Sequence, residues 1–234
     1  MAGYFEAINN NNSTLIDDQY SNYAFWMKGT VVTSAWPGIA VGARVKLPSN
    51  QTGAYPIVAL VHEGYVNLLG NLQVASGEWE TNFILSDTDT ATGVTLEWYA
   101  FLPSDTPEIS LKQTGLFCLW NADGKPIFDS DADYMRVVDF RYCTYPQSIN
   151  TSYLTGRKYA VVVAANQLYV RPARSPGGWG SLSGVSARVR SNGTASYSYV
   201  RLRTLRDGQP NPNSFQNQSK TDTGAFIILD VTNI

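Results

Sequence analysis

Short runs of apolar and alternating residues recur along the chain and predict strands. They are "GTVVTSAW" from residue 29, "IAVGARVKL" from 39, "YPIVALVHEGYVNLL" from 55, "VTLEWYAFL" from 94, "KYAVVVAA" from 158, "SARVR" from 186, "YSYVRLRTL" from 197 and "AFIILDV" from 225. Clusters of Gly, Pro, Asn and Asp separate these runs, as in sandwiches and barrels. No window keeps helical spacing over three turns. The pattern predicts an all-β protein.

Residues 185–206, "VSARVRSNGTASYSYVRLRTLR", predict a hairpin. Asn192-Gly193 is typical of a two-residue turn, which would place Val189 opposite Ser196. Alternation then gives a core face of Val185, Ala187, Val189, Val200 and Leu202, and an outer face of Arg188, Arg190, Tyr197, Tyr199, Arg201 and Arg203. A face of Arg and Tyr fits three interpretations: a solvated surface, a subunit interface, or a surface that binds a ligand or nucleic acid.

Residues 120–133, "WNADGKPIFDSDAD", are acidic and allow two interpretations. A calcium loop would use Asp129, Asp131 and Asp133 as its first three ligands. Such a loop needs Gly where Tyr134 stands, and a carboxylate where Phe140 stands. A hairpin explains more, because Asp-Gly tolerates positive φ and a proline suits the first position of the returning strand. We expect a hairpin, with weak calcium binding by the three carboxylates left open.

The acidic stretch belongs to a faint internal repeat. "GYFEAINNNNSTLIDD" (3–18) aligns without gaps on "GLFCLWNADGKPIFDS" (115–130). The identities are Gly3 with Gly115, Phe5 with Phe117, Asn9 with Asn121, and Asp17 with Asp129. A polar link that contains prolines, "LPSDTPEIS" (102–110), follows an apolar run. These signals predict two tandem β-sandwich-like domains, immunoglobulin-like or jelly-roll-like, over 1–112 and 113–234.

Charge divides the chain at the same place. Residues 1–112 carry a net charge of −7 and residues 113–234 a net charge of +5, so that the whole chain has −2. The halves could associate head to tail, or could be two solvated surfaces of uneven charge. A net charge of −2 gives no general affinity for nucleic acid or acidic membranes.

Few residues could carry catalysis or fix the protein in a membrane. The single histidine, His62, lies in "LVHEGY", where alternation predicts an ordinary strand residue. Cys118 and Cys143 make no disulfide framework, so we expect buried free thiols and synthesis in a reducing compartment. The apolar run 159–165 is too short to span a bilayer, and the N-terminus lacks a secretory pattern. We therefore expect no enzyme, no cofactor and no membrane insertion.

One loop is a further candidate for binding. "RSPGGWGS" (174–181) is rich in Gly and contains Trp179, but it lacks the spacing of a phosphate loop. An exposed Trp can stack on a sugar or anchor in a pocket of a partner, and a Trp that folds back packs on its own sheet.

Two stretches together resemble a family of small tail proteins of long-tailed bacteriophages. They are "INNNNSTLIDDQYSNYAFWMKGTV" from residue 8 and "GLFCLWNADGKPIFDSDADYMRVVDF" from residue 115. The matching positions are Ile16, Asp17, Tyr20 or Tyr23, Gly115, Leu116, Asn121, Gly124, Phe128, Asp129, Ser130, Tyr134, Arg136, Val137, Val138 and Asp139.

The resemblance implies a structural protein of the virion, in the distal tail, the baseplate or the fibres. It implies assembly with other tail proteins as rings or homotrimers, synthesis in the bacterial cytoplasm, and no catalytic residues. Two alternatives remain open at this point: a module that binds a host receptor or carbohydrate, and a capsid decoration protein.

Overall fold

The computed structural model describes residues 6–8, 14–17, 22–36, 41–86, 91–112, 115–120, 124, 126–171, 179–206 and 223–234. All regular elements in these ranges are strands, so the all-β prediction is confirmed. None of the described residues forms a helix that could cross a membrane.

The strands follow one another as β1 (Glu6–Ile8), β2 (Thr14–Asp17), β3 (Tyr23–Val32), β4 (Ser34–Ala35), β5 (Val41–Leu47), β6 (Ile57–Val61), β7 (Val66–Gln73), β8 (Trp79–Leu85), β9 (Thr95–Pro103), β10 (Cys118–Trp120), β11 (Pro126–Asp129), β12 (Val137–Thr144), β13 (Ser148–Ser152), β14 (Tyr159–Ala165), β15 (Gln167–Arg171), β16 (Trp179–Val189), β17 (Thr194–Arg206) and β18 (Thr223–Asp230).

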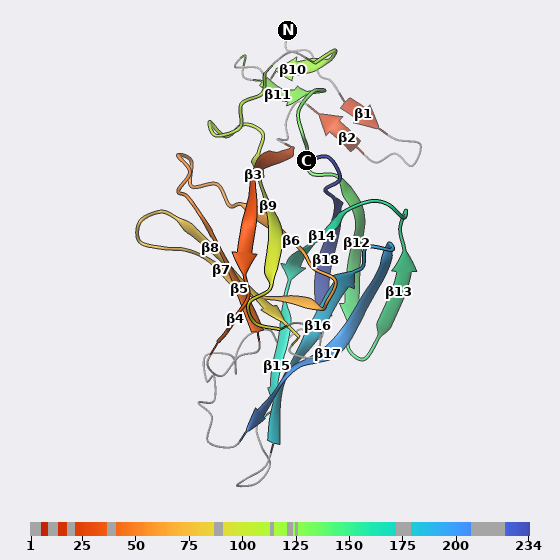
Figure 1. The fold of residues 1–234 in the computed structure, drawn as a ribbon. Coiled ribbons are helices and arrows are strands. Elements are labelled where there is room, and N and C mark those ends of the chain that lie inside the picture. Colours follow the sequence, from red (N-terminus) through yellow and green to blue (C-terminus); the bar gives the residue numbers. More distant parts are fainter. Residues whose placement is uncertain are drawn as a thin grey trace.

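The strands form two large antiparallel sheets and two small hairpins. The six-stranded sheet has the order β12-β18-β14-β6-β9-β3, and the eight-stranded sheet has the order β13-β17-β16-β7-β8-β5-β4, with β15 paired to β16. The hairpins β1-β2 and β10-β11 lie beside each other at one end of the molecule (Figure 1).

Each large sheet has the same order when it is read from either edge. In the six-stranded sheet β3, β9 and β6 take the places that β12, β18 and β14 take from the other edge. In the eight-stranded sheet β5, β8 and β7 correspond in the same way to β13, β17 and β16. We call β1–β9 the N-terminal repeat and β10–β18 the C-terminal repeat. β4 and β15 have no counterpart.

The small hairpins of the two repeats share one register. The pairs are Glu6–Asp17, Ala7–Ile16 and Ile8–Thr14 in the first, and Cys118–Asp129, Leu119–Phe128 and Trp120–Pro126 in the second. Every number in the second hairpin is 112 higher than in the first, and both ladders shift before the third pair. The repeat predicted over 3–18 and 115–130 is confirmed for the strands that the structure describes.

The strands that follow keep the same spacing. The ladder between β3 and β9 shifts after Phe25, and the ladder between β12 and β18 shifts after Val137, again 112 residues later. Beyond the bulge, Lys28 faces Tyr99 in one repeat and Phe140 faces Ile227 in the other. Bulges change the twist of an edge strand, so a shared bulge indicates that one backbone design is used twice.

The loops β7-β8 and β16-β17 are also equivalent. In each, a three-residue loop ends in a glycine with positive φ, Gly77 at 81° and Gly193 at 82°. Gly77 N–H donates to Val74 O at 2.8 Å, and Gly193 N–H donates to Arg190 O at 2.9 Å. This is the three-residue hairpin loop that closes on a residue in the left-handed region.

A pseudo-two-fold axis relates the repeats. Ala24 pairs antiparallel with Tyr134, so that Tyr23 faces its own counterpart, Met135, whose N–H donates to Tyr23 O at 2.8 Å. At the centre of the six-stranded sheet Leu60 faces Val161. The axis passes through both places, which explains why the equivalent hairpins lie at the same end of the molecule (Figure 1).

The two repeats share one core. The main cluster lies between the sheets and includes Val58, Leu60 and Phe83 from the N-terminal repeat and Tyr197 and Phe226 from the C-terminal repeat. A second cluster on the outer face of the six-stranded sheet lies along the axis and contains Tyr99, Phe101, Val162 and Leu229, with Tyr23 and Met135 packed against it.

The two halves therefore differ from the tandem domains that the sequence predicts. The predicted boundary, 112/113, falls between the repeats, but strands from both sides of it make up both large sheets and the main core. In each repeat, three strands of one large sheet pack on three strands of the other. The pairs β6-β14 and β7-β16 then join the two repeats into one sandwich.

Candidate functional site

The predicted face of Arg and Tyr does not form, because the hairpin loop is one residue longer than predicted. The loop contains Ser191, Asn192 and Gly193, and Val189 faces Ala195 in place of Ser196. A shift of one residue turns a strand over, since side chains alternate between faces. The prediction that Tyr197 and Tyr199 share an outer face with Arg188 and Arg190 is wrong.

The two tyrosines point inward. Tyr197 is fully buried in the main core, and Tyr199 packs against the same cluster, with its ring 4.7 Å from that of Tyr145. Val200 and Leu202 lie instead in a separate cluster with Ile84 and Leu182.

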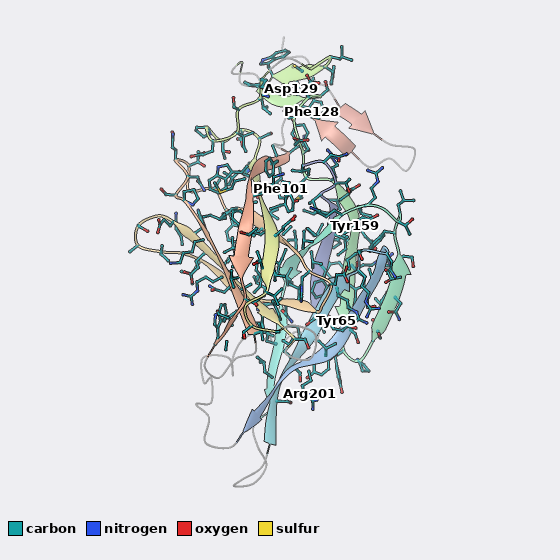
Figure 2. The ribbon with its side chains drawn as sticks, in the orientation of Figure 1. Tyr65, Phe101, Phe128, Asp129, Tyr159 and Arg201 are labelled. Atoms are coloured by element: carbon teal, nitrogen blue, oxygen red, sulfur yellow. The ribbon has the colours of Figure 1, made fainter. Side chains whose placement is uncertain are left out.

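The arginines are dispersed. The guanidinium of Arg188 lies 4.4 Å from the ring centroid of Tyr65, a cation–π contact within one subunit. Arg190 is exposed beside the hairpin loop, and Arg201 is exposed on β17 (Figure 2). The structure describes the backbone of Arg203 and Trp179 within β17 and β16 but not their side chains. A joint interface of these residues stays a prediction.

The acidic stretch forms the predicted hairpin. Gly124 has a φ of 74°, and Asp129, at the end of β11, is 1% exposed (Figure 2). Its Oδ1 accepts hydrogen bonds from the N–H groups of Gly115 (3.1 Å) and Asp131 (3.0 Å). Asp129 therefore ties the link before β10 to the loop after β11.

The other two carboxylates do not converge on Asp129. Asp133 pairs with Arg136 at 3.4 Å, and Asp131 is exposed. Within the ranges that the structure describes, no three His, Cys, Asp or Glu side chains are grouped to hold a metal ion. Calcium binding by this loop stays a prediction. Of the two free cysteines, Cys143 is buried and Cys118 is half-buried.

A polar network lies at the inner side of β12. Asp139 Oδ2 accepts hydrogen bonds from Arg141 Nε and from the Tyr153 hydroxyl, both at 2.7 Å. Tyr153 and Tyr197 share a 2.7 Å hydrogen bond, which Tyr197 donates because the proton of Tyr153 is already used. Burial raises the pKa of Tyr197 to about 12.

The network also sets the pKa of Asp139. Burial is the largest single influence and raises this pKa, but the hydrogen bonds from Tyr153 and Arg141 together outweigh burial, so the pKa of Asp139 lies below its ordinary value. Asp139 therefore stabilises the fold in its charged form.

We expect the stability that Asp139 provides to disappear in acid. Because its folded pKa is depressed, the contribution is complete above the unfolded pKa of about 3.9 and is lost as the pH falls through the folded pKa. Asp139→Asn should be less stable than the native protein at pH 7, and the difference should shrink below about pH 4. Urea unfolding at both pH values measures this. The exposed Asp131→Asn is the control, and a difference that does not depend on pH contradicts the prediction.

Exposed apolar side chains gather on the first part of the C-terminal repeat. Among the large apolar side chains of the described residues, those exposed between 116 and 145 are Leu116, Phe117, Trp120, Val137, Val138, Phe140, Tyr142 and Tyr145. Contiguous exposed apolar surface marks interaction sites. The rings of Phe140 and Tyr142 meet edge to face at 4.9 Å. We call Val138, Phe140 and Tyr142 the β12 patch.

The alternation of β12 is inverted. Its charged residues, Asp139 and Arg141, point toward the tyrosine network, whereas the β12 patch points outward, with Phe140 46% and Tyr142 63% exposed. From sequence alone, "VVDFRY" predicts the opposite orientation, because apolar residues usually face the core.

The equivalent strand shows that the fold does not require this patch. In β3 the counterparts of Val138, Phe140 and Tyr142 are Trp26, Lys28 and Thr30, from the shared register. Lys28 and Thr30 are exposed and polar. The same backbone positions are therefore compatible with polar residues, and the fold does not require the aromatic pair there.

A cleft of about 1000 Å³ opens where the repeats meet. Its lining includes Lys28, His62, Glu97, Trp98, Arg157, Lys158, Tyr159 and Arg190. Two contacts cross it between the repeats: Lys158 Nζ lies 2.9 Å from Glu97 Oε2, and Lys28 Nζ donates to Ile234 O at 2.6 Å. His62 follows β6 directly and is not a strand residue, contrary to the prediction.

No protein-family model, no curated protein and no solved structure matches this chain.

Proposed function

We propose that this chain is a non-enzymatic structural protein of a bacteriophage tail. It acts in the distal tail or baseplate, or where fibres attach, by docking as a homo-oligomer onto other tail subunits. Its place is the virion, and its synthesis takes place in the bacterial cytoplasm. The observation that carries the proposal is the exposed apolar surface at 116–145, because a surface of this kind fits a protein that is buried in an assembly.

The resemblance supports the same proposal. The stretches that resemble tail proteins contain β2 with the last residue of β1, most of β3, the hairpin β10-β11 and the beginning of β12. The second stretch also supplies much of the exposed apolar surface, including Phe117, Trp120 and Phe140. Three of the matching positions, Leu116, Val137 and Val138, are themselves exposed apolar residues of this surface.

Fractionation of virions tests the proposal. Antibodies or mass spectrometry should find the protein in purified phage and in isolated tails at a fixed copy number, and not on isolated heads. Detection on heads alone would favour the capsid decoration alternative, and absence from virions would refute a structural function.

A second candidate is a module that binds a receptor or carbohydrate. The cleft between the repeats favours it, because aromatic walls with polar and cationic groups at the rim suit a small polar ligand. Free protein should then compete with phage for adsorption to cells. Arg157→Ala/Arg190→Ala should abolish this competition, whereas a tail component without receptor contact would not compete at all.

A further inference from the structure

β12 is an edge strand whose regular part, from Asp139 on, contains neither lysine nor proline; its bulge lies before that part, at Val138. In the described part of the chain its ladder partner is β18 alone, which leaves the other edge open. Natural edge strands are commonly protected by an outward lysine, a proline or a covering segment. β12 has no proline or lysine and presents Phe140 and Tyr142 beside that edge.

The other edge of the same sheet has such protection. β3 carries Lys28 at the position of Phe140, and its beginning is already paired, with Phe25 N–H donating to Asp133 O at 2.7 Å. Among the described residues, the edge of β3 thus carries a lysine that the equivalent edge of β12 lacks.

The sequence of β12 is complementary to itself. When two copies of Val138–Tyr142 run antiparallel with Phe140 facing Phe140, each Val138 faces a Tyr142, and each Asp139 faces an Arg141. Directly opposed side chains of opposite charge stabilise a sheet, as do aromatic and β-branched pairs. An inward charge at an edge normally opposes pairing, but here the second copy supplies the opposite charge.

β3 does not suit β12 as a partner in this register. A β12 strand that paired with β3 in this register would place Asp139 and Arg141 opposite Gly29 and Met27, and Phe140 opposite Lys28. Neither charge would gain a partner, and the apolar contact would be lost.

We propose that two copies of this chain pair through antiparallel β12 strands, in register about Phe140, and so join their six-stranded sheets into one continuous sheet. The interface is isologous and closes with two copies. This inference rests on the proposed function only in that both require self-association.

Solution mass tests the pairing. Sedimentation equilibrium in the micromolar range should show a dimer. Phe140→Lys/Tyr142→Thr places in β12 the residues that β3 carries at the same positions, so the fold tolerates them. This variant should raise the dimer dissociation constant about tenfold or more. Val32→Thr, an exposed apolar change on β3, is the matched control and should leave the mass unchanged. A native monomer or trimer, or a dimer that the double change leaves intact, overturns the proposal.

Disulfide trapping tests the register independently of stability. In a Cys118→Ser background, Phe140→Cys should cross-link to a second copy under mild oxidation, because facing residues lie about 5 Å apart at Cβ. Val138→Cys should cross-link with Tyr142→Cys when the two proteins are mixed, but neither should cross-link alone. Equal cross-linking by Lys28→Cys would overturn the pairing.

The failure of this inference can be distinguished from failure of the proposed function. A trimer that is found in isolated tails refutes the β12 pairing and leaves the proposed function standing. A β12-linked dimer that is absent from virions supports the β12 pairing and refutes the proposed function.

Discussion

Asn67→Leu should lower the free energy of unfolding by about 3 kcal/mol. Asn67 is fully buried in β7, where β7 joins the C-terminal repeat. Its Nδ2 donates to Val185 O at 2.7 Å and to Gln167 O at 3.2 Å, and its Oδ1 accepts from Leu68 N–H at 2.7 Å. Leucine has a similar volume but offers none of these bonds, so buried backbone groups on three strands lose their partner.

The size of this effect comes from the position of Asn67. In the eight-stranded sheet the repeats meet where Ala187 faces Val66, and the side chain of Asn67 supplies the hydrogen bonds beside that pair. Gly184 makes room for it, since a Cβ there would lie 2.7 Å from Asn67 Nδ2 and 2.4 Å from Gln167 O. Gly184→Ala should therefore weaken the same contact from the other repeat.

Urea unfolding followed by tryptophan fluorescence measures the change. Asn166→Ala is the control, because Asn166 is half-buried and donates one hydrogen bond, to Leu68 O at 2.9 Å. Asn166→Ala should lower the free energy of unfolding by about 1 kcal/mol. Equal losses of unfolding free energy for Asn67→Leu and Asn166→Ala would show that the junction between β7 and β16 does not depend on Asn67.

Gly193→Ala should lower the free energy of unfolding by about 3 kcal/mol, whereas its counterpart Gly77→Ala should lower it by about 1 kcal/mol. Both glycines have the same left-handed φ, so both changes impose the same backbone strain. A Cβ at Gly193 would lie 2.6 Å from Tyr153 O, but a Cβ at Gly77 would have only Ser49 Cβ nearby, at 3.3 Å. The difference arises from the backbone of Tyr153, which cannot move away freely because its N–H donates to Gly193 O at 2.9 Å.

Unfolding of the two variants in the same urea series checks this prediction. The two loops belong to one core, so a single transition should report both changes. Losses of equal size would mean that the Tyr153 contact adds nothing to the strain. A larger loss for Gly77→Ala would contradict the assigned equivalence of the two loops.

Local signals predicted the parts of this fold that depend on local physics. Alternating apolar runs indicated most strands, and Asp123-Gly124 with Pro126 indicated the hairpin β10-β11. β8, β13 and β15 were missed, because the segments Trp79–Leu85, Ser148–Ser152 and Gln167–Arg171 show no clean alternation of apolar and polar residues. The run from Tyr55 to Leu69 looked like one unit but supplies strands to both large sheets.

The candidate site depended on register, which local signals define poorly. Asn192-Gly193 fits a two-residue turn and a three-residue loop equally well, and the choice decides whether Tyr197 faces solvent or the core. The inverted orientation of β12 could not be predicted either, because it depends on Tyr153, just after β13, and on Tyr197, which lies far along the chain in β17.

The all-β class, the hairpin at 115–130 and its repeat at 3–18 follow from local sequence, because turn chemistry and side-chain alternation act over a few residues. That the two halves share sheets in place of forming separate sandwiches depends on long-range contacts. That outcome requires β6 to meet β14 and β7 to meet β16, contacts between strands about a hundred residues apart in the chain. The same long-range pairing left the edge of β12 open and its aromatic side chains exposed.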